Sequence, residues 1–348
     1  MTSDPINAWL MRLCDPEGCS GLPARQLDQA GLKRLLQLAD EHAVTGAVLD
    51  NIRRIETADG RGRIVRESPG CDPAAVETAR AAARDRWFDL VAHALFLRQR
   101  AATIVRALAD AGVTAGLVKG EDFADRLYAP SSLRPFRDID LLLPQEQMPV
   151  AADVMAALGF REAGCGRHAG GYGERTWDGP DRPLVRVDLH WNLINSPTQR
   201  HHSSLPYEAF PWAPATSRAG TGILRTSPAG MLLVAAVHAA LGHRFDRLQQ
   251  LCDIRQICRG VAGPVDVDWL AEAAARHGVA TAVAGALEVT ARLLDDEATA
   301  DVRRRMGGRR TTTVPWRVLV NESTLLDATR PVTKLRRAIV REWMKRAA

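Results

Sequence analysis

The sequence predicts an α+β fold, in which a mixed sheet is flanked by helices and lies between two helical regions. The first observation is a pair of regions, 6–56 and 228–294, in which apolar residues recur at helical spacing. The second is the stretch between them, 113–195, in which short apolar runs alternate with helical patterns and Gly or Pro breaks. We therefore expect three regions: an N-terminal helical region at 1–110, an α/β core at 111–227, and a C-terminal helical region at 228–348 that ends in a basic amphipathic tail.

The N-terminal region is expected to hold two or three helices in residues 6–56, followed by a loop at 57–73 that is rich in Gly, Pro and charged residues. The pair Asp72-Pro73 suits a helix cap and a first turn, so a long helix is expected over about 74–111. We expect its apolar stripe to pack along the sheet and its basic residues to lie at the solvated surface.

The core begins with a short apolar strand at 115–118, which ends in Lys119-Gly120, and a helix is expected over 121–128. A cationic side chain, a Gly turn and a helix N-terminus are three features that hold an anionic phosphate. This junction is therefore a candidate phosphate site.

The next strand, 138–143, opens with two acids, Asp138 and Asp140, separated by one residue. On a strand both side chains leave the same face, and two neighbouring carboxylates repel each other unless a cation lies between them. A hard divalent ion such as Mg²⁺ is the usual cation. With 41 acidic residues in 348, an acid-x-acid pair occurs by chance about five times, so the pair alone is not diagnostic.

A third acid strengthens the pattern. Asp188 and His190 lie in an alternating run at 184–190 and share one of its faces. Taken singly, each acid has a structural alternative, such as an ion pair of Asp188 with Arg186. Taken together, three acids at strand positions beside a phosphate site indicate metal-assisted chemistry on a nucleotide.

Local patterns describe the rest of the chain. A helix at about 146–158 and a strand that begins at residue 159 precede a Gly-rich stretch, 164–173, which we interpret as a hairpin turn or a mobile lid. Residues 196–227 are interpreted as a substrate-side loop that leaves the sheet. The C-terminal helices are expected at 228–243, 245–260, 267–277 and 279–294. His238, on the first of these, could reach the active site, but we favour a hydrogen-bonded role in helix packing.

The composition points to a protein of the reducing cytoplasm. The apolar fraction of 46% and the charged fraction of 25% are ordinary for a globular chain. The six cysteines include no Cys-x-x-Cys pair, so we expect neither a zinc ribbon nor a disulfide framework. The sequence also has no signal-peptide pattern and no apolar run of membrane-spanning length.

The net charge of +5 lies in the last residues, 331–348, which hold six basic groups against one acid, so that the rest of the chain is neutral overall. Leu335, Ile339 and Trp343 are spaced like the apolar face of a helix in this segment. We expect the tail either to pack against the protein or to contact RNA, an acidic peptide or an anionic surface.

The order of these features carries a family resemblance. It runs from an apolar strand through Lys119-Gly120, a helix, Leu-Arg-Pro and Asp-Ile-Asp to Asp-Leu-His-Trp and a helical segment at 232–258. This order, over about 75–290, resembles an uncharacterised bacterial family of the polymerase-β-like nucleotidyltransferase superfamily, whose members often accompany peptide natural-product gene clusters. Two positions depart from the superfamily. It usually has Gly-Ser in place of Lys-Gly, and a residue smaller or less charged than Arg137 before the first Asp.

The resemblance implies a polymerase-β-type mixed sheet and an activity. The enzyme would transfer a nucleoside monophosphate from an NTP to a hydroxyl or similar acceptor and release pyrophosphate. Asp138, Asp140 and Asp188 would bind two Mg²⁺ ions, or Mn²⁺, and Asp188 would also serve as general base. Phosphate and nucleotide contacts are expected from five residues: Lys119, Gly120, Arg134, Arg137 and His190. By strand parity, His190 is also expected to orient Asp188.

Three hypotheses for the partner stay open. The first is an enzyme that modifies a small molecule or a peptide natural product. The second is a toxin-like transferase that adds nucleotides to tRNA, which the basic tail would favour. The third is a non-catalytic, peptide-binding partner in a maturation complex, and the complete set of three acids argues against it.

Overall fold

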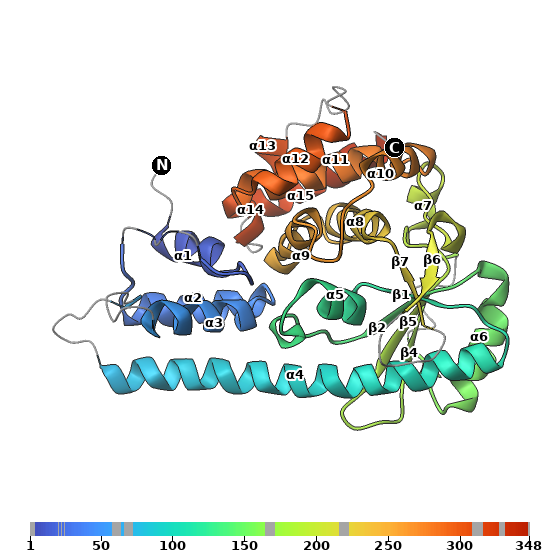
Figure 1. Ribbon diagram of the computed structural model, residues 1–348, viewed down its shortest axis with the longest axis horizontal. Coiled ribbons are helices and arrows are strands. Elements are labelled where there is room, and N and C mark those ends of the chain that lie inside the picture. The colour runs from blue at the N-terminus through green and yellow to red at the C-terminus, as the bar shows by residue number, and fades with distance from the viewer. Residues whose placement is uncertain are drawn as a thin grey trace.

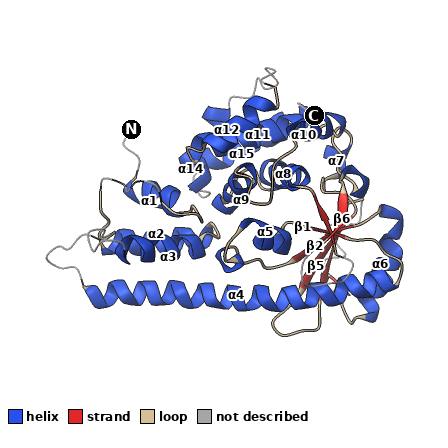
Figure 2. Ribbon diagram, viewed as in Figure 1, coloured by secondary structure: helices blue, strands red, loops and turns tan. Residues whose placement is uncertain are grey.

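The computed structural model describes residues 4–19, 21, 23, 25–57, 64–65, 72–163, 171–215, 223–307, 316–326 and 331–346. A seven-stranded mixed sheet lies between one long helix and a layer of C-terminal helices, as Figure 1 shows. Figure 2 shows the strands gathered at one end of the molecule, with helices around them. The predicted α+β class, with helical regions at both termini, is confirmed. No helix in these ranges combines the length and the apolar run that crossing a bilayer requires.

The strands are β1 (Gly116–Val118), β2 (Ile139–Leu142), β3 (Arg161–Glu162), β4 (Glu174–Asp178), β5 (Arg186–His190), β6 (Trp212–Pro214) and β7 (Leu224–Thr226). They lie in the order β3-β4-β5-β2-β1-β7-β6. β2 is antiparallel to β1 and parallel to β5, while β1 is parallel to β7 and β4 is antiparallel to β5. The sheet is mixed because neighbouring strands come from separate parts of the chain.

The N-terminal helices are α1 (Pro5–Leu13), α2 (Gln29–Glu41), α3 (Thr45–Thr57) and α4 (Pro73–Asp110). The core adds α5 (Gly120–Leu127), α6 (Met148–Ala157) and α7 (Pro197–Arg200), with 3₁₀ turns at Ser131–Leu133, Gln145–Gln147 and Tyr207–Ala209. The C-terminal helices are α8 (Pro228–Val237), α9 (Leu248–Cys258), α10 (Val267–Arg276), α11 (Ala280–Leu293), α12 (Glu297–Arg305), α13 (Trp316–Leu319), α14 (Glu322–Leu326) and α15 (Pro331–Arg346). A π-helical turn, His238–Gly242, follows α8.

Alternation along β2 and β5 divides their side chains between two cores. Ile139, Leu141 and Val187 belong to the core that α4 and α6 cover. Leu142 belongs to the other core, which includes the buried residues of α8 and α9. Asp140 has the parity of Leu142, so its side chain lies on the face toward the C-terminal helices.

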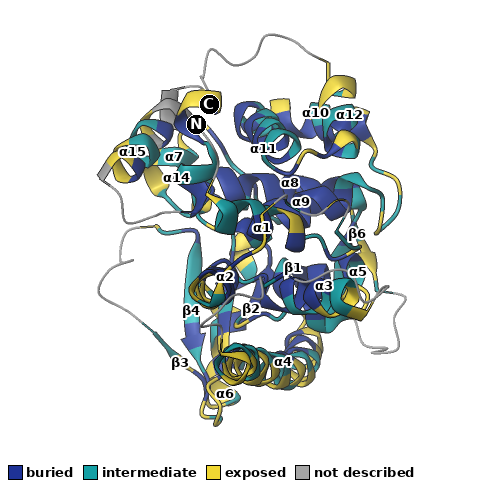
Figure 3. Ribbon diagram, turned by 90° about the vertical axis from the view of Figure 1, so that its left-hand side faces the viewer, coloured by how far each residue is buried: buried dark blue, intermediate teal, exposed yellow. Residues whose placement is uncertain are grey.

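The long helix α4 spans the molecule and connects the N-terminal helices to the sheet (Figure 1). It begins as predicted, because the Asp72 side chain accepts a hydrogen bond from the amide of Ala74 and Pro73 occupies the first turn. Its second half buries Leu97, Ile104 and other apolar residues against the sheet. Figure 3 shows it end-on, with exposed residues on its outer side.

The helix α8 lies at the centre of the C-terminal region, as the dark ribbon in Figure 3 shows. Every residue of α8 from Ala229 to Val237 is buried. A helix that is apolar all round must be covered on all sides, and α8 contacts α9, α10 and α11. The expected single helix at 228–243 instead changes to the π-helical turn at His238.

Several local expectations were wrong or incomplete. The segment 196–227, expected as a loop, contributes β6 and β7, and β7 extends the sheet beside β1. In α15 the expected apolar face is only partly buried, because Ile339 packs against the core whereas Leu335 is 62% exposed; Val340, outside that face, is 1% exposed. Most of the Gly-rich stretch and of the loop at 57–73 lies outside the described residues.

Candidate active site

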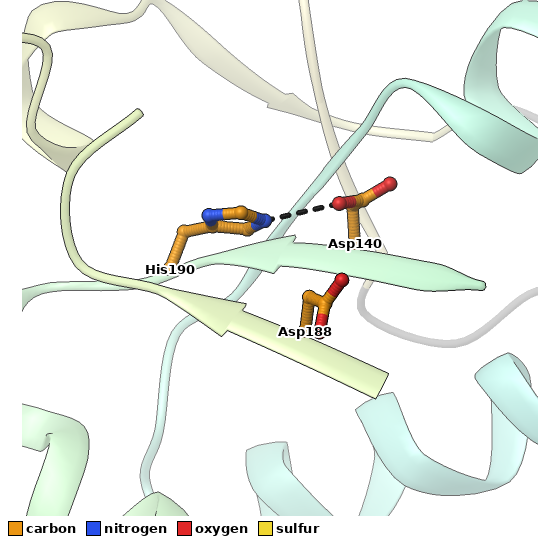
Figure 4. Close-up of side chains that lie close together, drawn as sticks. All are labelled: Asp140, Asp188 and His190. Atoms are coloured by element: carbon orange, nitrogen blue, oxygen red, sulfur yellow. Dashed lines mark hydrogen bonds and ion pairs between the residues drawn. The ribbon is translucent and has the colours of Figure 1, made fainter. Parts of the chain in front are cut away.

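Asp140 and Asp188 meet because β2 and β5 are parallel neighbours. In their register Asp140 lies opposite Asp188, and Leu142 lies opposite His190. The side chains of Asp140, Asp188 and His190 gather on one face of the sheet, as Figure 4 shows, and each offers a ligand atom within 4.8 Å of the other two. The structure therefore brings two of the three predicted acids together with the predicted histidine.

Asp138 lies directly before β2 and lines the same cavity as the other two acids. The negative charge of Asp140 is the main cause that raises the pKa of Asp138 to about 6, with burial second. Burial, followed by the charge of Asp140, raises the pKa of Asp188 as well. Asp138 and Asp188 thus both resist ionisation beside the charged Asp140. Additional positive charge would stabilise such a site.

Lys119 supplies the local positive charge at Asp140. Its Nζ atom lies 2.6 Å from Oδ1 of Asp140, and the two side chains are only 13% and 6% exposed. Burial opposes the ionisation of Asp140, but Lys119 and His190 outweigh it and hold the pKa of this carboxyl well below its usual value. Burial would likewise lower the pKa of Lys119, but Asp140 outweighs it and the pKa is raised. The predicted phosphate ligand thus contacts a predicted metal ligand.

A tight turn at Lys119-Gly120 joins β1 to α5. Lys119 has φ of 56° and ψ of −133°, a conformation that is rare for a residue with a side chain. A Cβ atom on Gly120 would lie 3.3 Å from the carbonyl oxygen of Asp138, so glycine lets this turn pack closely against the segment before β2. The turn positions Lys119 beside the acids and places the start of α5 at the same cavity.

His190 links two carboxylates. Its Nε2 atom lies 3.0 Å from Oδ1 of Asp140, and its Nδ1 atom lies 3.4 Å from Oε2 of Glu174. We predicted that His190 would orient Asp188, and the structure corrects this. The hydroxyl of Thr176 donates to Asp188 at 2.6 Å, while His190 orients Asp140.

Glu174 and Thr176 belong to the site but were missed from the sequence. Because β4 is antiparallel to β5, Glu174 lies opposite His190 and Thr176 lies opposite Asp188. The signal in the sequence is the alternation of β4, in which Trp177 is buried in the α4-side core while the two polar residues face the site. β4 has only five residues and follows the Gly-rich stretch, so its alternation is difficult to recognise in the sequence.

The two predicted arginines have different surroundings. Arg134 is buried, and its Nε and Nη2 atoms bind Asp253 of α9 at 2.7 and 2.8 Å. Its Nη1 atom donates to the carbonyl oxygen of Gly120 at 2.9 Å. These contacts indicate a structural role, while Arg134 also lines the cavity, and the expected phosphate contact stays a prediction. Arg137 is exposed at the cavity, and its guanidinium forms no ion pair within the described part of the chain.

A cavity of about 850 Å³ lies over the acids. Its lining includes residues of the segment 193–199, Val234 and Val237 of α8, residues between His238 and Gln249, and Ala43 of the N-terminal region. This volume is at the upper end of the range for small-molecule pockets. The cavity thus has room for a nucleotide and lies between all three regions of the chain.

His238 lines this cavity, so the alternative that it reaches the active site gains support. Its ring centroid lies 4.5 Å from that of His243. Burial is the main cause that lowers the pKa of His238 well below its usual value, so the ring is neutral at neutral pH. The π-helical turn that begins at this residue is a feature often found at functional sites.

The mixed sheet and the acid cluster are compatible with an enzyme of nucleotidyl transfer. The chain belongs to the family described as uncharacterised nucleotidyltransferase, which matches residues 28–295. No match was found among curated proteins. Membership of the family implies an NTP as substrate, and the group formed by Asp140, Asp188 and His190 is compatible with a divalent metal.

Proposed function

We propose that the enzyme transfers a nucleoside monophosphate from an NTP to a hydroxyl group of a small molecule or a peptide. The observation that carries the proposal is the cluster of Asp140, Asp188 and His190, with ligand atoms within 4.8 Å of one another, at a cavity of about 850 Å³. In the reaction, the acceptor oxygen forms a bond to the α-phosphorus while the bond to the departing pyrophosphate breaks in line with it.

The residues of the cluster fit a divalent ion such as Mg²⁺ or Mn²⁺. Asp138, Asp140 and Asp188 offer carboxylate oxygens, which these hard ions prefer, and His190 orients Asp140 through its hydrogen bond. The repulsion by Asp140 that raises the pKa of Asp138 to about 6 is relieved by a cation in this position. When bound, such ions lower the pKa of an attacking hydroxyl and neutralise charge on the phosphates.

The residues of the chain then take separate roles. Lys119 and the amide groups at the start of α5 hold the β- and γ-phosphates, because a cation and a helix N-terminus both favour anions. Arg137, exposed at the cavity, offsets the charge that grows on pyrophosphate. Asp188, whose pKa is raised by burial, accepts the proton of the acceptor hydroxyl, and Thr176 orients it.

The cavity wall supports a polar acceptor of modest size. Asn195 lines the cavity next to the acids and donates a hydrogen bond to Glu174. An RNA acceptor has less support, because Arg336 and Arg337 of the basic tail donate hydrogen bonds to Thr324 of the protein itself. Two of the side chains that favoured RNA are thus held by hydrogen bonds within the protein.

The test is the substitution Asp140→Asn, which keeps the shape of the side chain and removes its charge. Incubation with each α-labelled NTP, Mg²⁺ and cell extract identifies the labelled fraction for the wild type, and intact-mass analysis detects self-modification. In the variant we expect transfer to fall by at least about a hundredfold, since one preorganised charge contact is worth that much.

A matched control is Asp153→Asn, the same substitution at an exposed position of α6. This control should transfer label at the wild-type rate, and circular dichroism should show that both variants are folded. Unchanged transfer by Asp140→Asn, or no transfer by the wild type with any NTP, would remove the proposal.

A further inference from the structure

We propose that Lys119 acts as an internal substitute for a metal ion: its ammonium group neutralises Asp140 in the resting enzyme and leaves it when a divalent cation and an NTP bind. This inference rests on the proposed function, because it concerns the same site and its metal. It adds a role for Lys119 before the nucleotide arrives, and it predicts that metal and lysine compete for one carboxylate.

The contact geometry is the first step. Nζ of Lys119 and Nε2 of His190 both approach Oδ1 of Asp140, at 2.6 and 3.0 Å. The same carboxylate contributes to the group of ligand atoms within 4.8 Å that suits a metal. A divalent ion bound by Asp140 would lie beside the ammonium group of Lys119. Two neighbouring cations that are shielded from water repel each other strongly. Lys119 must therefore move for the metal to bind well.

The backbone of Lys119 is the second step. Its φ of 56° and ψ of −133° place a side-chain-bearing residue in a sparsely populated, strained region of backbone conformation. Glycine would adopt this conformation without strain, so the lysine is held here at a cost in stability. The strain indicates that the side chain has a function at this turn, and its only ion pair among the described residues is with Asp140.

The destination of the lysine is the third step. Lys119 precedes the first turn of α5, and no side chain caps this helix start. The proposed function places the β- and γ-phosphates there, within reach of a long, flexible lysine side chain. An NTP that brings a divalent ion to Asp140 thus also brings a new anionic partner for the displaced ammonium group. The ammonium group of Lys119 therefore has an anionic partner both before and after the nucleotide binds.

The experiment measures Mn²⁺ binding to the nucleotide-free protein by electron paramagnetic resonance, with Mn²⁺ standing in for Mg²⁺. Lys119→Met should bind Mn²⁺ at least about tenfold more tightly than the wild type, because an opposite charge within 4–6 Å changes the affinity of a carboxylate for a cation by at least that factor. Binding of Mn²⁺ with a non-hydrolysable α,β-methylene NTP should instead weaken by about tenfold, the value of one charged hydrogen bond.

The opposite signs of these two changes are the signature of exchange. A merely structural lysine would weaken both kinds of binding or neither. Lys119→Gly provides a second variant that folds without backbone strain and should show the same two changes. The control Arg247→Met removes one exposed cation that lines the cavity and forms no ion pair with Asp140. It should change Mn²⁺ affinity by less than about threefold because exposed charges are screened.

Weaker or unchanged Mn²⁺ binding in both Lys119 variants would overturn the inference. So would an equal gain in the Arg247 control, which would show that only the total charge of the cavity matters. The Mn²⁺ titration without nucleotide does not depend on the group that is transferred. The inference and the proposed function can therefore fail separately.

Discussion

Replacing Arg134 with methionine should destabilise the fold by about 3–5 kcal/mol, because it leaves a buried carboxylate without its cationic partner. Arg134 and Asp253 are only 8% and 5% exposed, and two nearly parallel hydrogen bonds join them. Tyr128 also donates to Asp253 at 2.7 Å, but a neutral hydroxyl does not replace the lost positive charge. The variant therefore retains the cost of burying Asp253 and loses the compensation.

Replacing both partners tests whether this cost belongs to the ion pair. Arg134→Met combined with Asp253→Leu removes both charges at similar volume, so it should cost less than the sum of the two single substitutions by at least about 2 kcal/mol. The double variant should still be less stable than the wild type. Tyr128 loses its acceptor, at about 1–3 kcal/mol for a buried polar group left unpaired, and the carbonyl of Gly120 loses one of its hydrogen bonds.

Urea unfolding of the wild type, the two single variants and the double variant gives the four free energies. A loss below about 1 kcal/mol for Arg134→Met would contradict the reasoning, since breaking a buried pair costs several times more. In that case the role expected from the sequence would regain support. Isothermal titration would then show a large loss of NTP affinity in a variant of normal stability.

Two further predictions concern stability. Burial is the main cause that raises the pKa of Glu121 from 4.5 to about 7. A carboxyl with a raised folded pKa binds extra protons in the folded state, so the wild type loses stability as pH rises from about 4.5 to 7, by about 3 kcal/mol. Glu121→Gln should thus be more stable than the wild type at pH 8 and equal to it at pH 4 in urea unfolding; the same difference at both pH values would contradict this. Gly116→Ala should lower the free energy of unfolding by about 1–3 kcal/mol, because the added Cβ would lie 2.3 Å from the ring of Trp212. An unchanged unfolding midpoint would show that β6 does not pack there.

The acids could be predicted from the sequence because their placement follows from local geometry. Alternation on a strand puts Asp138 and Asp140 on one face whatever the rest of the chain does, and the same parity applies to Asp188 and His190. What the sequence did not determine is the partner of each residue. His190 has the parity of Asp188, yet it binds Asp140 on the adjacent strand, because the register between β2 and β5 depends on packing across the whole sheet.

Arg134 shows why a residue type predicts chemistry less well than position does. A buried arginine beside a phosphate site suits a phosphate and a carboxylate equally, since its planar fork binds either in a bidentate manner. Asp253, its partner, lies in α9 of a different region, and no local pattern connects the two residues. Only the packing of α9 against α5 and the segment before β2 distinguishes these roles.

We expect different parts of the cavity to serve the chemistry of the enzyme and its choice of acceptor. The acids and Lys119 lie on strands and turns whose local pattern is visible in the sequence. Another part of the cavity wall includes a π-helical turn that the apolar pattern of 228–243 conceals. Beyond this turn, Arg244 and Phe245 both have positive φ, and Phe245 is fully buried. Such strained positions persist only when surrounding packing holds them, so the shape of this wall is determined by the assembled helices. Substitutions in the wall should therefore alter which acceptor is used, while substitutions among the acids should alter whether any acceptor is used.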